Sequence, residues 1–393
     1  MSAIFLQGQS CICALGDTPQ GIRAGLFGGT ATGVAPSEAW SPGTMLHVGA
    51  FAGALPSVAH LPARLRSRSN ALLLAALAPL RAQAEAAIER FGPARVAVVL
   101  GVSAAGLDEG LAAQRALQAG AGWPGGYDYA VQEMGNAAQC LARELGAGGP
   151  AYAISTACSS GARALATGAR LLRAGVADAV VAGGVDALSS FTIAGFRALE
   201  AVAAERCNPL SSNRRGINIG EGAALFLMGR DAGPVRLAGW GETADAHHMS
   251  APDPEGRGAT DAMRLALARA GIAARDVDYV NLHGTATEHN DAMESRAIAN
   301  VDGLAAPVSS TKPLTGHALA AAGAIEAAFA WHALVDNPQG LLPPHWWDGA
   351  ADAALPPLRV VAPGFTLGRP VRHVISNSFA FGGSNAALLF SQG

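Results

Sequence analysis

Short runs of apolar residues, bounded by glycine, alternate along the chain with longer stretches rich in Ala, Leu and Arg. In the first part of the sequence these runs predict buried strands at Arg95–Gly101, Ala151–Ser155, Ala179–Gly183 and Ala223–Met228. The stretch Ser159–Ala174 places apolar residues at helical spacing, with arginines on the other faces. Strands and helices that alternate in this way are typical of layered α/β proteins.

The same alternation starts again after Gly229. Helices are expected at Thr260–Ala270 and Leu319–Val335, and strands are expected at Val235–Gly239, Asp278–His283, Pro307–Thr311 and His373–Ser376. Two consecutive sets of similar elements predict two duplicated halves, residues 1–228 and 229–393. No low-complexity linker separates the halves, so one compact body is expected.

Composition narrows the class of protein. Half of the 393 residues are apolar and 15% are charged, which predicts a large buried core. The net charge of −3 gives no basic excess for binding nucleic acid. The five cysteines have no framework spacing, and reduced thiols in the cytoplasm are expected. No basic segment precedes an apolar stretch at the N-terminus, and apolar runs such as Ala71–Leu80 are too short for a membrane span, so neither a signal peptide nor a span is expected.

Cys158 lies between a predicted strand and a predicted helix, in the small-residue segment STACSSG. Free N–H groups at a helix N-terminus favour thiolate and can lower the pKa of a cysteine from about 8.5 to roughly 3.5–7.5. A cysteine on its own is usually a buried structural residue, and Cys140 and Cys207 keep that interpretation. The small residues around Cys158 instead predict a nucleophile that an acyl chain can approach.

Two histidines lie in separate loops rich in Gly and Thr. His283 follows a predicted strand in LHGTATEHND, and His317 precedes a small-residue helix in SSTKPLTGHALAAAG. Two neutral imidazoles that face a thioester carbonyl can both donate hydrogen bonds to an enolate. Lys312 is expected behind them, paired with Glu326 or Glu294, either to tune the histidines or as a plain structural ion pair.

The segment NSFAFGGSN near the C-terminus has two phenylalanines followed by two glycines. Phe379 and Phe381 can gate a pocket, with a backbone N–H group completing an oxyanion hole, while Gly382 and Gly383 allow unusual backbone angles. A strand-edge turn packed by two core phenylalanines explains the same residues equally well. The doublet His247–His248 has no further ligands at suitable spacing, so no metal site is expected.

Together these segments resemble the elongating β-ketoacyl-acyl carrier protein synthases, condensing enzymes of the thiolase superfamily, nearly from end to end of the chain. The resemblance implies a thiolase-like duplicated fold with five αβαβα layers. It implies a catalytic set of Cys158, His283 and His317. The supporting residues that it implies are Lys312 and Glu326, with Asp291 and Glu294 in the acidic stretch after the first histidine.

The resemblance also implies a two-stage reaction. Cys158 takes an acyl group from acyl carrier protein, and malonyl-carrier then loses carbon dioxide beside the two histidines and attacks the acyl group. Backbone N–H groups of Cys158 and Phe381 would hold the oxyanion. The product is a β-ketoacyl carrier that is two carbons longer. Members are usually homodimers and need no metal or cofactor.

Three departures from the family pattern point to a dedicated pathway rather than housekeeping fatty-acid synthesis. Ala380 stands where the family usually has glycine between the gate phenylalanines, the segment from Phe196 to Glu221 looks short, and EHND follows the first histidine motif. A pathway to an aryl polyene or a polyketide-like product is one hypothesis.

Acyl carriers are acidic, so a basic docking patch is expected, unless the charged run is simply a solvated face. The candidates are Arg64, Arg66, Arg68 and Arg206, with Arg214 and Arg215 beside the last. Two other functions stay open: a non-catalytic chain-length subunit of a heterodimer, and a cysteine-dependent thioester hydrolase. A thiolase would need a second cysteine near the C-terminus, and an initiating synthase would have Asn in place of His317.

Overall fold

Ten strands form one mixed sheet in the computed structural model, which describes residues 3–28 and 33–393; their order is β10-β9-β11-β12-β8-β1-β7-β6-β4-β5. The first five are β1 (Phe5–Cys13), β4 (Val96–Gly101), β5 (Ala151–Ile154), β6 (Ala179–Asp186) and β7 (Gly222–Gly229). The second five are β8 (Val235–Ala244), β9 (Tyr279–Asn281), β10 (Val308–Ser309), β11 (His373–Ala380) and β12 (Ser384–Gln392). Within each five, the strands follow the same order, and the two groups join where Phe5 and Leu6 pair with Arg236 and Val235.

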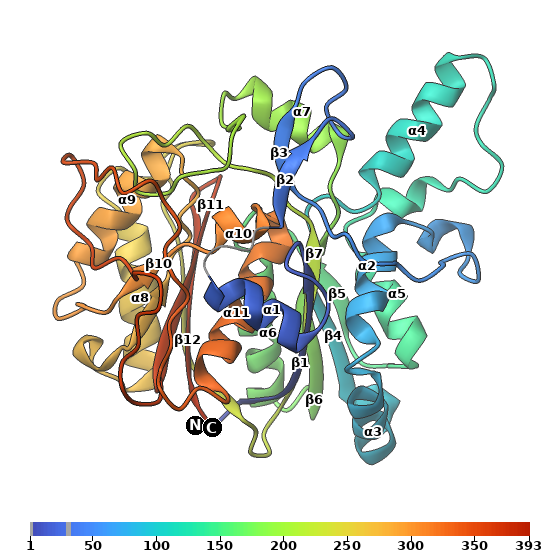
Figure 1. Cartoon of the computed structure of the whole chain (residues 1–393). Helices are drawn as coiled ribbons and strands as arrows, with labels where there is room; N and C mark the ends of the chain where they lie inside the picture. The colour runs from blue at the N-terminus through green and yellow to red at the C-terminus, as the bar shows by residue number, and fades with distance from the viewer. Residues whose placement is uncertain (1–2, 29–32) are drawn as a thin grey trace.

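Helices lie between the two groups of strands and on both outer faces (Figure 1). The central layer holds α6 (Ser160–Arg173) and α11 (Ala322–Leu334). One outer face is covered by α2 (Arg68–Leu77), α3 (Arg81–Phe91) and α5 (Asn136–Leu145), and the other by α8 (Arg257–Ala270) and α9 (Glu288–Ala299). The predicted αβαβα architecture is therefore confirmed.

The remaining elements lie outside the main sheet. The helices are α1 (Pro19–Gly28), α4 (Leu107–Gln118), α7 (Ser190–Ala198) and α10 (Lys312–Thr315). A separate hairpin is formed by β2 (Val34–Ser37) and β3 (Leu46–Gly49). Single 3₁₀ turns are η1 (Ala63–Leu65), η2 (Pro93–Arg95), η3 (Tyr129–Gln132), η4 (Ala274–Asp276) and η5 (Leu319–Ala321).

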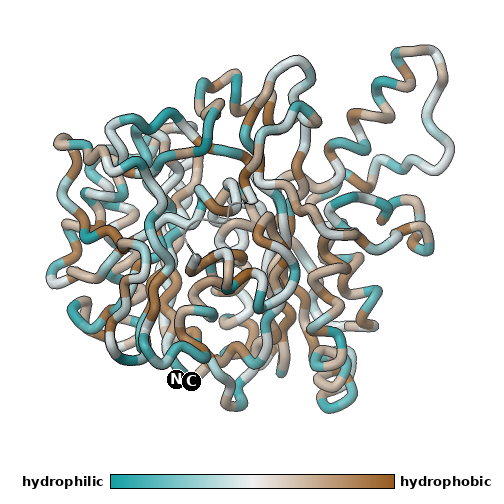
Figure 2. Tube along the Cα trace, in the orientation of Figure 1, coloured by the Kyte–Doolittle hydropathy of each residue, from teal (hydrophilic) through white to brown (hydrophobic). Residues whose placement is uncertain are grey.

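Burial explains why the strands read as unbroken apolar runs. Every residue of β4, β6 and β7 is buried, because helices cover both faces of these strands. Helix α11 is apolar apart from Glu326 and His332, as expected of a helix between two sheets, and Trp331 is its one residue that is not buried. In Figure 2 hydrophobic segments follow the strands and the inner helices, while hydrophilic segments gather on the outer helices and loops.

All eight predicted strands and all three predicted helices are present, with ends shifted by a few residues. One detail is wrong: β5 is half-buried rather than buried, because it is the last strand of the sheet. Among the described residues, no single helix is long and apolar enough to cross a membrane. The pair α2 and α3 reaches that length and composition only together, across a bend of 76°.

Candidate active site

Cys158 sits in a tight turn between β5 and α6, as the sequence predicts. Ala157 has a φ of 49°, a backbone conformation that residues other than glycine rarely adopt. Small hydroxyl side chains hold the turn: Ser160 Oγ accepts from the N–H of Thr156 at 2.8 Å, and Ser159 Oγ donates to the Thr156 carbonyl at 2.8 Å. Larger side chains at Ser159 and Ser160 could not form these short hydrogen bonds within the turn. This requirement accounts for the small residues beside the cysteine.

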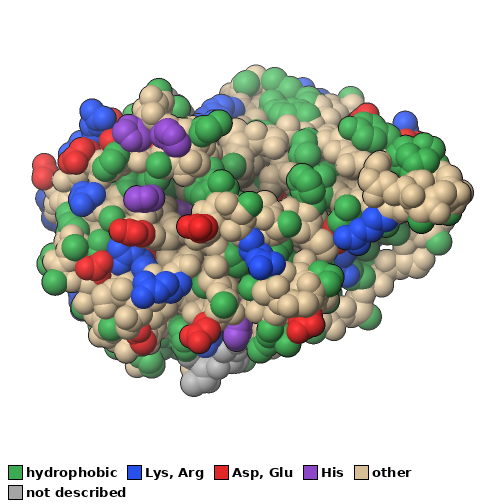
Figure 3. All heavy atoms as spheres, turned by 90° about the horizontal axis from the view of Figure 1, so that it is seen from above, with side chains coloured by type: hydrophobic (Ala, Val, Ile, Leu, Met, Phe, Trp, Pro, Cys, Tyr) green, Lys and Arg blue, Asp and Glu red, His purple; other side chains and the backbone are tan. Residues whose placement is uncertain are grey.

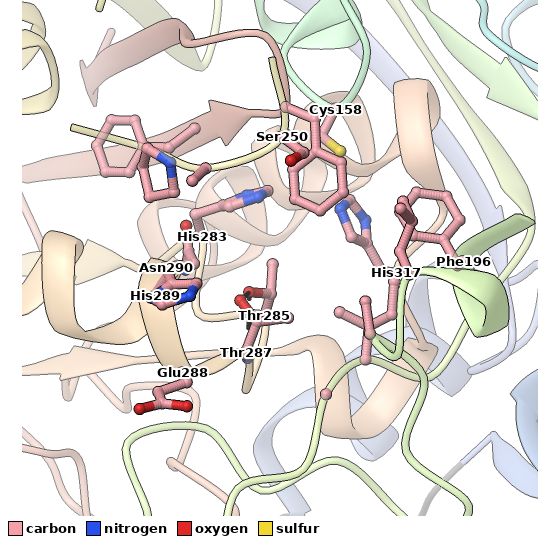
Figure 4. Close-up of a pocket in the computed structure, with 18 of the residues that line it drawn as sticks. Cys158, Phe196, Ser250, His283, Thr285, Thr287, Glu288, His289, Asn290 and His317 are labelled. Atoms are coloured by element: carbon pink, nitrogen blue, oxygen red, sulfur yellow. Dashed lines mark hydrogen bonds between the residues drawn. The ribbon is translucent and has the colours of Figure 1, made fainter. Parts of the chain in front are cut away.

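The structure brings Cys158 together with both predicted histidines (Figure 4). His283 follows β9, and His317 lies between α10 and η5. The Cys158 sulfur and one ring nitrogen of each histidine all lie within 4.8 Å of one another, and all three side chains are buried. The two imidazole rings meet edge to face, with 5.2 Å between their centroids. Three residues that are 34 to 159 positions apart therefore form one cluster.

The cluster lies in the wall of a cavity of about 530 Å³. Thr285 and Thr287, which alternate after His283, line the cavity together with Ser250 and His289. These polar residues were not predicted from the sequence as residues of the site. The alternation of two threonines directly behind a predicted site histidine was the available signal.

The expected lowering of the Cys158 pKa is wrong. Burial raises the pKa of this thiol to about 11, and this effect outweighs the opposing influences of the Lys312 charge and of hydrogen bonds from the backbone N–H groups of Cys158 and Phe381. The helix N-terminus favours a thiolate, but its field does not offset the removal of water from the sulfur. The resting cysteine is therefore a thiol.

This shift predicts the pH dependence of Cys158 alkylation by iodoacetamide. Only the thiolate reacts, so the rate should rise about tenfold per pH unit between roughly pH 7 and 10, without a plateau. Site-resolved peptide mass spectrometry of the alkylated chain measures this rate. A plateau below about pH 8 would show that the helix N-terminus does lower the pKa, as the sequence alone suggested.

Both histidines are uncharged in this environment. Burial lowers the pKa of His283 well below its ordinary value, assisted by the nearby charge of Lys312, and the same two causes lower the pKa of His317. Both ring nitrogens of His317 lack a hydrogen-bond partner among the residues that the structure describes. An imidazole in this state can donate one hydrogen bond and accept another from a bound substrate.

Lys312 pairs with Glu326, which confirms the first of the two predicted partners. The Lys312 Nζ atom lies 2.6 Å from Glu326 Oε1, donates to the carbonyl of His283, and lies 3.4 Å from His283 Nδ1. Both members of the ion pair are buried. Lys312 thus holds the His283 loop against α11, the helix that carries Glu326.

Glu294, the other candidate partner, supports the same loop differently. Its two carboxylate oxygens accept from the N–H groups of His283 and Gly284, each at 2.8 Å, and burial raises its pKa to about 7. Asp291 accepts from the N–H groups of Leu210 and Ala286 at 2.8 and 3.2 Å. Asp291 and Glu294 therefore hold the backbone of the loop around His283, and neither of them lines the cavity.

The C-terminal segment closes one side of the cluster. The Phe379 ring meets His283 edge to face at 6.3 Å, and the Phe381 ring lies 5.7 Å from Phe196. The backbone N–H groups of Cys158 and Phe381 both act on the Cys158 sulfur and lower the pKa of its thiol, against the larger effect of burial. This is the pair of N–H groups that the resemblance implied for an oxyanion hole.

The two glycines of this segment adopt left-handed backbone angles, with φ of 83° for Gly382 and 74° for Gly383. The N–H of Gly382 donates to the Met249 carbonyl at 3.0 Å, and the Gly383 carbonyl accepts from the N–H of Asp245 at 2.9 Å. The segment is therefore tied to the loop that follows β8.

The predicted docking arginines are only partly free. Arg64 and Arg66 are exposed, but the Arg68 guanidinium binds the buried Glu221 carboxylate at 2.5 and 2.8 Å. Arg206 donates to the Pro313 carbonyl at 2.8 Å and lies over the Trp346 ring, and burial lowers its pKa to about 10. We therefore drop Arg68 and Arg206 as docking candidates, because partners within the chain already bind their charges.

The remaining sequence candidates outside the cluster keep structural interpretations. Cys140 and Cys207 are buried free thiols, and burial raises the pKa of each to about 12. The thiol and the two imidazoles of the cluster are also groups that can bind zinc. The expectation that no metal takes part in the reaction stays a prediction.

Two family models match the chain. Residues 4–232 match the family model described as β-ketoacyl synthase, N-terminal domain, and residues 235–345 match that of the C-terminal domain. Nodulation protein E of Rhizobium meliloti (strain 1021) is 34% identical over 362 residues, which are 88% of each protein. 3-oxoacyl-[acyl-carrier-protein] synthase 2 of Staphylococcus aureus (strain COL) is 35% identical over 271 residues, or 63% of each protein.

Two solved structures extend the comparison over the whole chain. A chain in the complex of the ketosynthase ApeO with its chain length factor ApeC, from Xenorhabdus doucetiae, is 41% identical with a TM-score of 0.94, covering 100% of this chain and 98% of that one. A β-ketoacyl synthase from Burkholderia phymatum STM815 is 27% identical with a TM-score of 0.87, covering 100% of both chains.

Proposed function

The chain belongs to the β-ketoacyl synthase family, a family of acyltransferases, and we propose that it condenses malonyl-carrier with an acyl group held on Cys158. The observation that supports this reaction best is the cluster itself. One thiol and two uncharged imidazoles lie within 4.8 Å in the wall of one cavity. Nucleophilic transfer needs the thiol, and enolate formation needs two neutral donors.

In the first half of the reaction, the Cys158 sulfur attacks the carbonyl carbon of an acyl-carrier thioester. A neutral imidazole of the cluster takes the thiol proton and passes it to the departing carrier thiol. The backbone N–H groups of Cys158 and Phe381, which both act on the sulfur, stabilise the oxyanion that forms on the carbonyl. The bond from the acyl carbon to the carrier sulfur breaks as the bond to Cys158 forms.

In the second half, malonyl-carrier takes the place of the free carrier. His283 and His317 donate hydrogen bonds to its thioester oxygen, so that the bond to the carboxylate can break and carbon dioxide leaves an enolate. The enolate carbon attacks the acyl group on Cys158, whose sulfur leaves as a thiolate and takes up one proton from water. Burial, assisted by the Lys312 charge, keeps both imidazoles unprotonated, and Lys312 also holds the His283 loop.

The alternatives explain less of the site. A thioester hydrolase needs only one Cys-His pair, so it leaves the second uncharged imidazole of the cluster unexplained. A non-catalytic chain-length subunit has no use for a buried nucleophile in a strained turn beside two uncharged histidines.

We propose acyl carrier protein as the donor of both substrates, and a second ketosynthase-like subunit as a stable partner. The relative that is 41% identical was solved as a ketosynthase with its chain length factor, which favours a heterodimer over a homodimer. The half-exposed edge strand β5 is available for such a partner. A cytoplasmic location fits the five free cysteines.

The departures at Ala380, in the segment from Phe196 to Glu221 and in EHND support a dedicated pathway, for which we propose aryl or polyunsaturated acyl chains as substrates. The test is to supply malonyl-carrier with saturated, polyunsaturated and aryl acyl-carriers, with and without a co-expressed chain-length subunit, and to weigh the carrier products. Extension of the aryl or polyunsaturated primers supports the proposal. Preference for saturated primers would contradict it and point to general fatty-acid synthesis.

Arg64 and Arg66 are the exposed remainder of the predicted docking patch. Figure 3 shows basic and acidic side chains interspersed over one face of the molecule rather than a uniform basic field. Binding of the acidic carrier would therefore depend on a few arginines. Arg66→Glu is expected to raise the KM for carrier substrates about three- to tenfold at low salt, with little change in kcat. The exposed Arg90→Glu on α3 changes the net charge equally and serves as the control. An equal effect of both variants would mean that net charge, not a patch, attracts the carrier.

A further inference from the structure

One buried carboxylate near the cluster has no part in the mechanism above. Asp186 is the last residue of β6 and is fully buried. Its oxygens accept from the N–H and hydroxyl of Ser103 at 2.9 and 2.5 Å, from the N–H of Ala104 at 2.7 Å and from the N–H of Ala320 at 2.8 Å. A buried carboxylate needs such donors, and here they come from both halves of the chain.

The bond to Ala320 acts on the segment that carries His317. Ala320 lies in η5, which begins two residues after His317 and runs directly into α11. Leu319, between them, has a φ of 51°, so the chain reverses there in a conformation that needs support. A carboxylate at the first N–H groups of a helix satisfies them and interacts favourably with the helix dipole. Asp186 thus fixes the point at which the chain leaves His317.

The turn after His317 packs on backbone rather than on side chains. A Cβ atom added to Gly161 would lie 2.7 Å from the Ala320 carbonyl oxygen, and one added to Gly184 would lie 3.0 Å from it. Gly161 belongs to the first turn of α6, next to Cys158. Because no side chain separates these segments, a shift of Ala320 moves His317 relative to Cys158 directly.

The other donors belong to the loop after β4. Ala104 packs with Leu188, Ile193 and Leu319 in an apolar cluster, and Phe196 of the cavity wall packs against this cluster. One carboxylate therefore joins the loop behind the cavity wall to the turn after His317.

We infer that Asp186 is a positioning residue for the malonyl half of the reaction, because it holds His317 at the distance from Cys158 that stabilisation of the enolate requires. The inference rests on the proposed function. The charge of Asp186 also acts on the nucleophile, since it raises the pKa of the Cys158 thiol. Removal of this carboxylate charge should therefore change the two halves of the reaction in opposite directions.

The test is Asp186→Asn, which keeps the shape but places an NH₂ donor where N–H groups already donate. Decarboxylation of malonyl-carrier is expected to fall about 10- to 100-fold, because a small misplacement of a reacting group has an effect of that size. Alkylation of Cys158 by iodoacetamide at about pH 8 is expected to become faster, because the neighbouring negative charge is gone. A purely structural role would slow decarboxylation without raising the reactivity of the thiol.

Two further variants make the test decisive. Asp278→Asn removes another buried carboxylate that accepts backbone N–H groups, those of Arg372 and His373, and both rates should match wild type. Ser103→Ala removes one of the four bonds but keeps the charge, so decarboxylation should fall about two- to fivefold with alkylation unchanged.

The inference is overturned if Asp186→Asn leaves decarboxylation unchanged or lowers both rates together. If Asp186→Asn does not fold, a Ser103→Ala variant that decarboxylates malonyl-carrier at the wild-type rate overturns the inference instead. A wild-type chain that never decarboxylates malonyl-carrier refutes the proposed function, and the inference with it, whereas an active wild type with an unaltered Asp186→Asn refutes the inference alone.

Discussion

Cys158→Ala is expected to abolish condensation, with a loss of roughly 10⁴-fold or more, because no other thiol lines the described cavity to carry the acyl group. In intact-mass spectra, the wild-type chain incubated with acyl-carrier should gain the mass of one acyl group, and the variant should gain none. The side chain is buried beside small residues, so the loss of one sulfur leaves the fold intact.

Cys140→Ala is the matched control for this prediction. Cys140 is also a buried free thiol, but it lies in α5 against the outer face of the first group of strands. The control should acylate and condense like the wild type. An acyl adduct on the Cys158→Ala chain, or one mapped to a different cysteine, would contradict the assignment of the nucleophile.

His317→Ala is expected to separate the two halves of the reaction. Loss of one of two donors to the enolate should slow decarboxylation of malonyl-carrier by about 10²- to 10³-fold. Acylation of Cys158 should persist, because His283 remains to relay the thiol proton and the N–H groups of Cys158 and Phe381 are unchanged. Released carbon dioxide measures decarboxylation, and intact mass measures acylation of Cys158. His283→Ala should behave in the same way, with a further loss from disturbance of Lys312.

A buried histidine outside the cluster provides the comparison. His332 lies in α11, and burial lowers its pKa to about 4, so it is also uncharged. His332→Gln should leave both steps near wild type after correction for the folded fraction. If His317→Ala lost acylation and decarboxylation equally, the histidine would act chiefly on the thiol, and the division of roles would be wrong.

The sequence predicted the elements that are strongly apolar and the residues that share a motif. β4, β6 and β7 were recognisable because burial on both faces demands unbroken apolar runs. Two strands of the sheet were missed: β1 alternates between buried and half-buried positions and contains Gln and Gly, and β12 follows directly after the glycines of the gate segment. Cys158, His283 and His317 were found from their glycine and hydroxyl neighbours, which are the residues that tight turns need.

What the sequence did not predict depends on contacts between distant residues. The pKa of Cys158 is set by the depth of its burial, which local sequence does not report. Arg68 was predicted to be free because Glu221 lies 153 positions away. Asp186 ends a buried strand and has no motif, so its link to the turn after His317 is visible only in three dimensions.

The most direct test of the account is a single-turnover experiment on the wild-type chain. The chain is first acylated on Cys158 and freed of excess acyl-carrier, and malonyl-carrier is then added while the masses of enzyme and carrier are followed together. The account predicts that the acyl mass leaves the enzyme at the rate at which a carrier bearing that acyl group plus two carbons and a keto group appears. Loss of the acyl mass as free acid, with malonyl-carrier unchanged, would contradict condensation and identify the chain as a hydrolase.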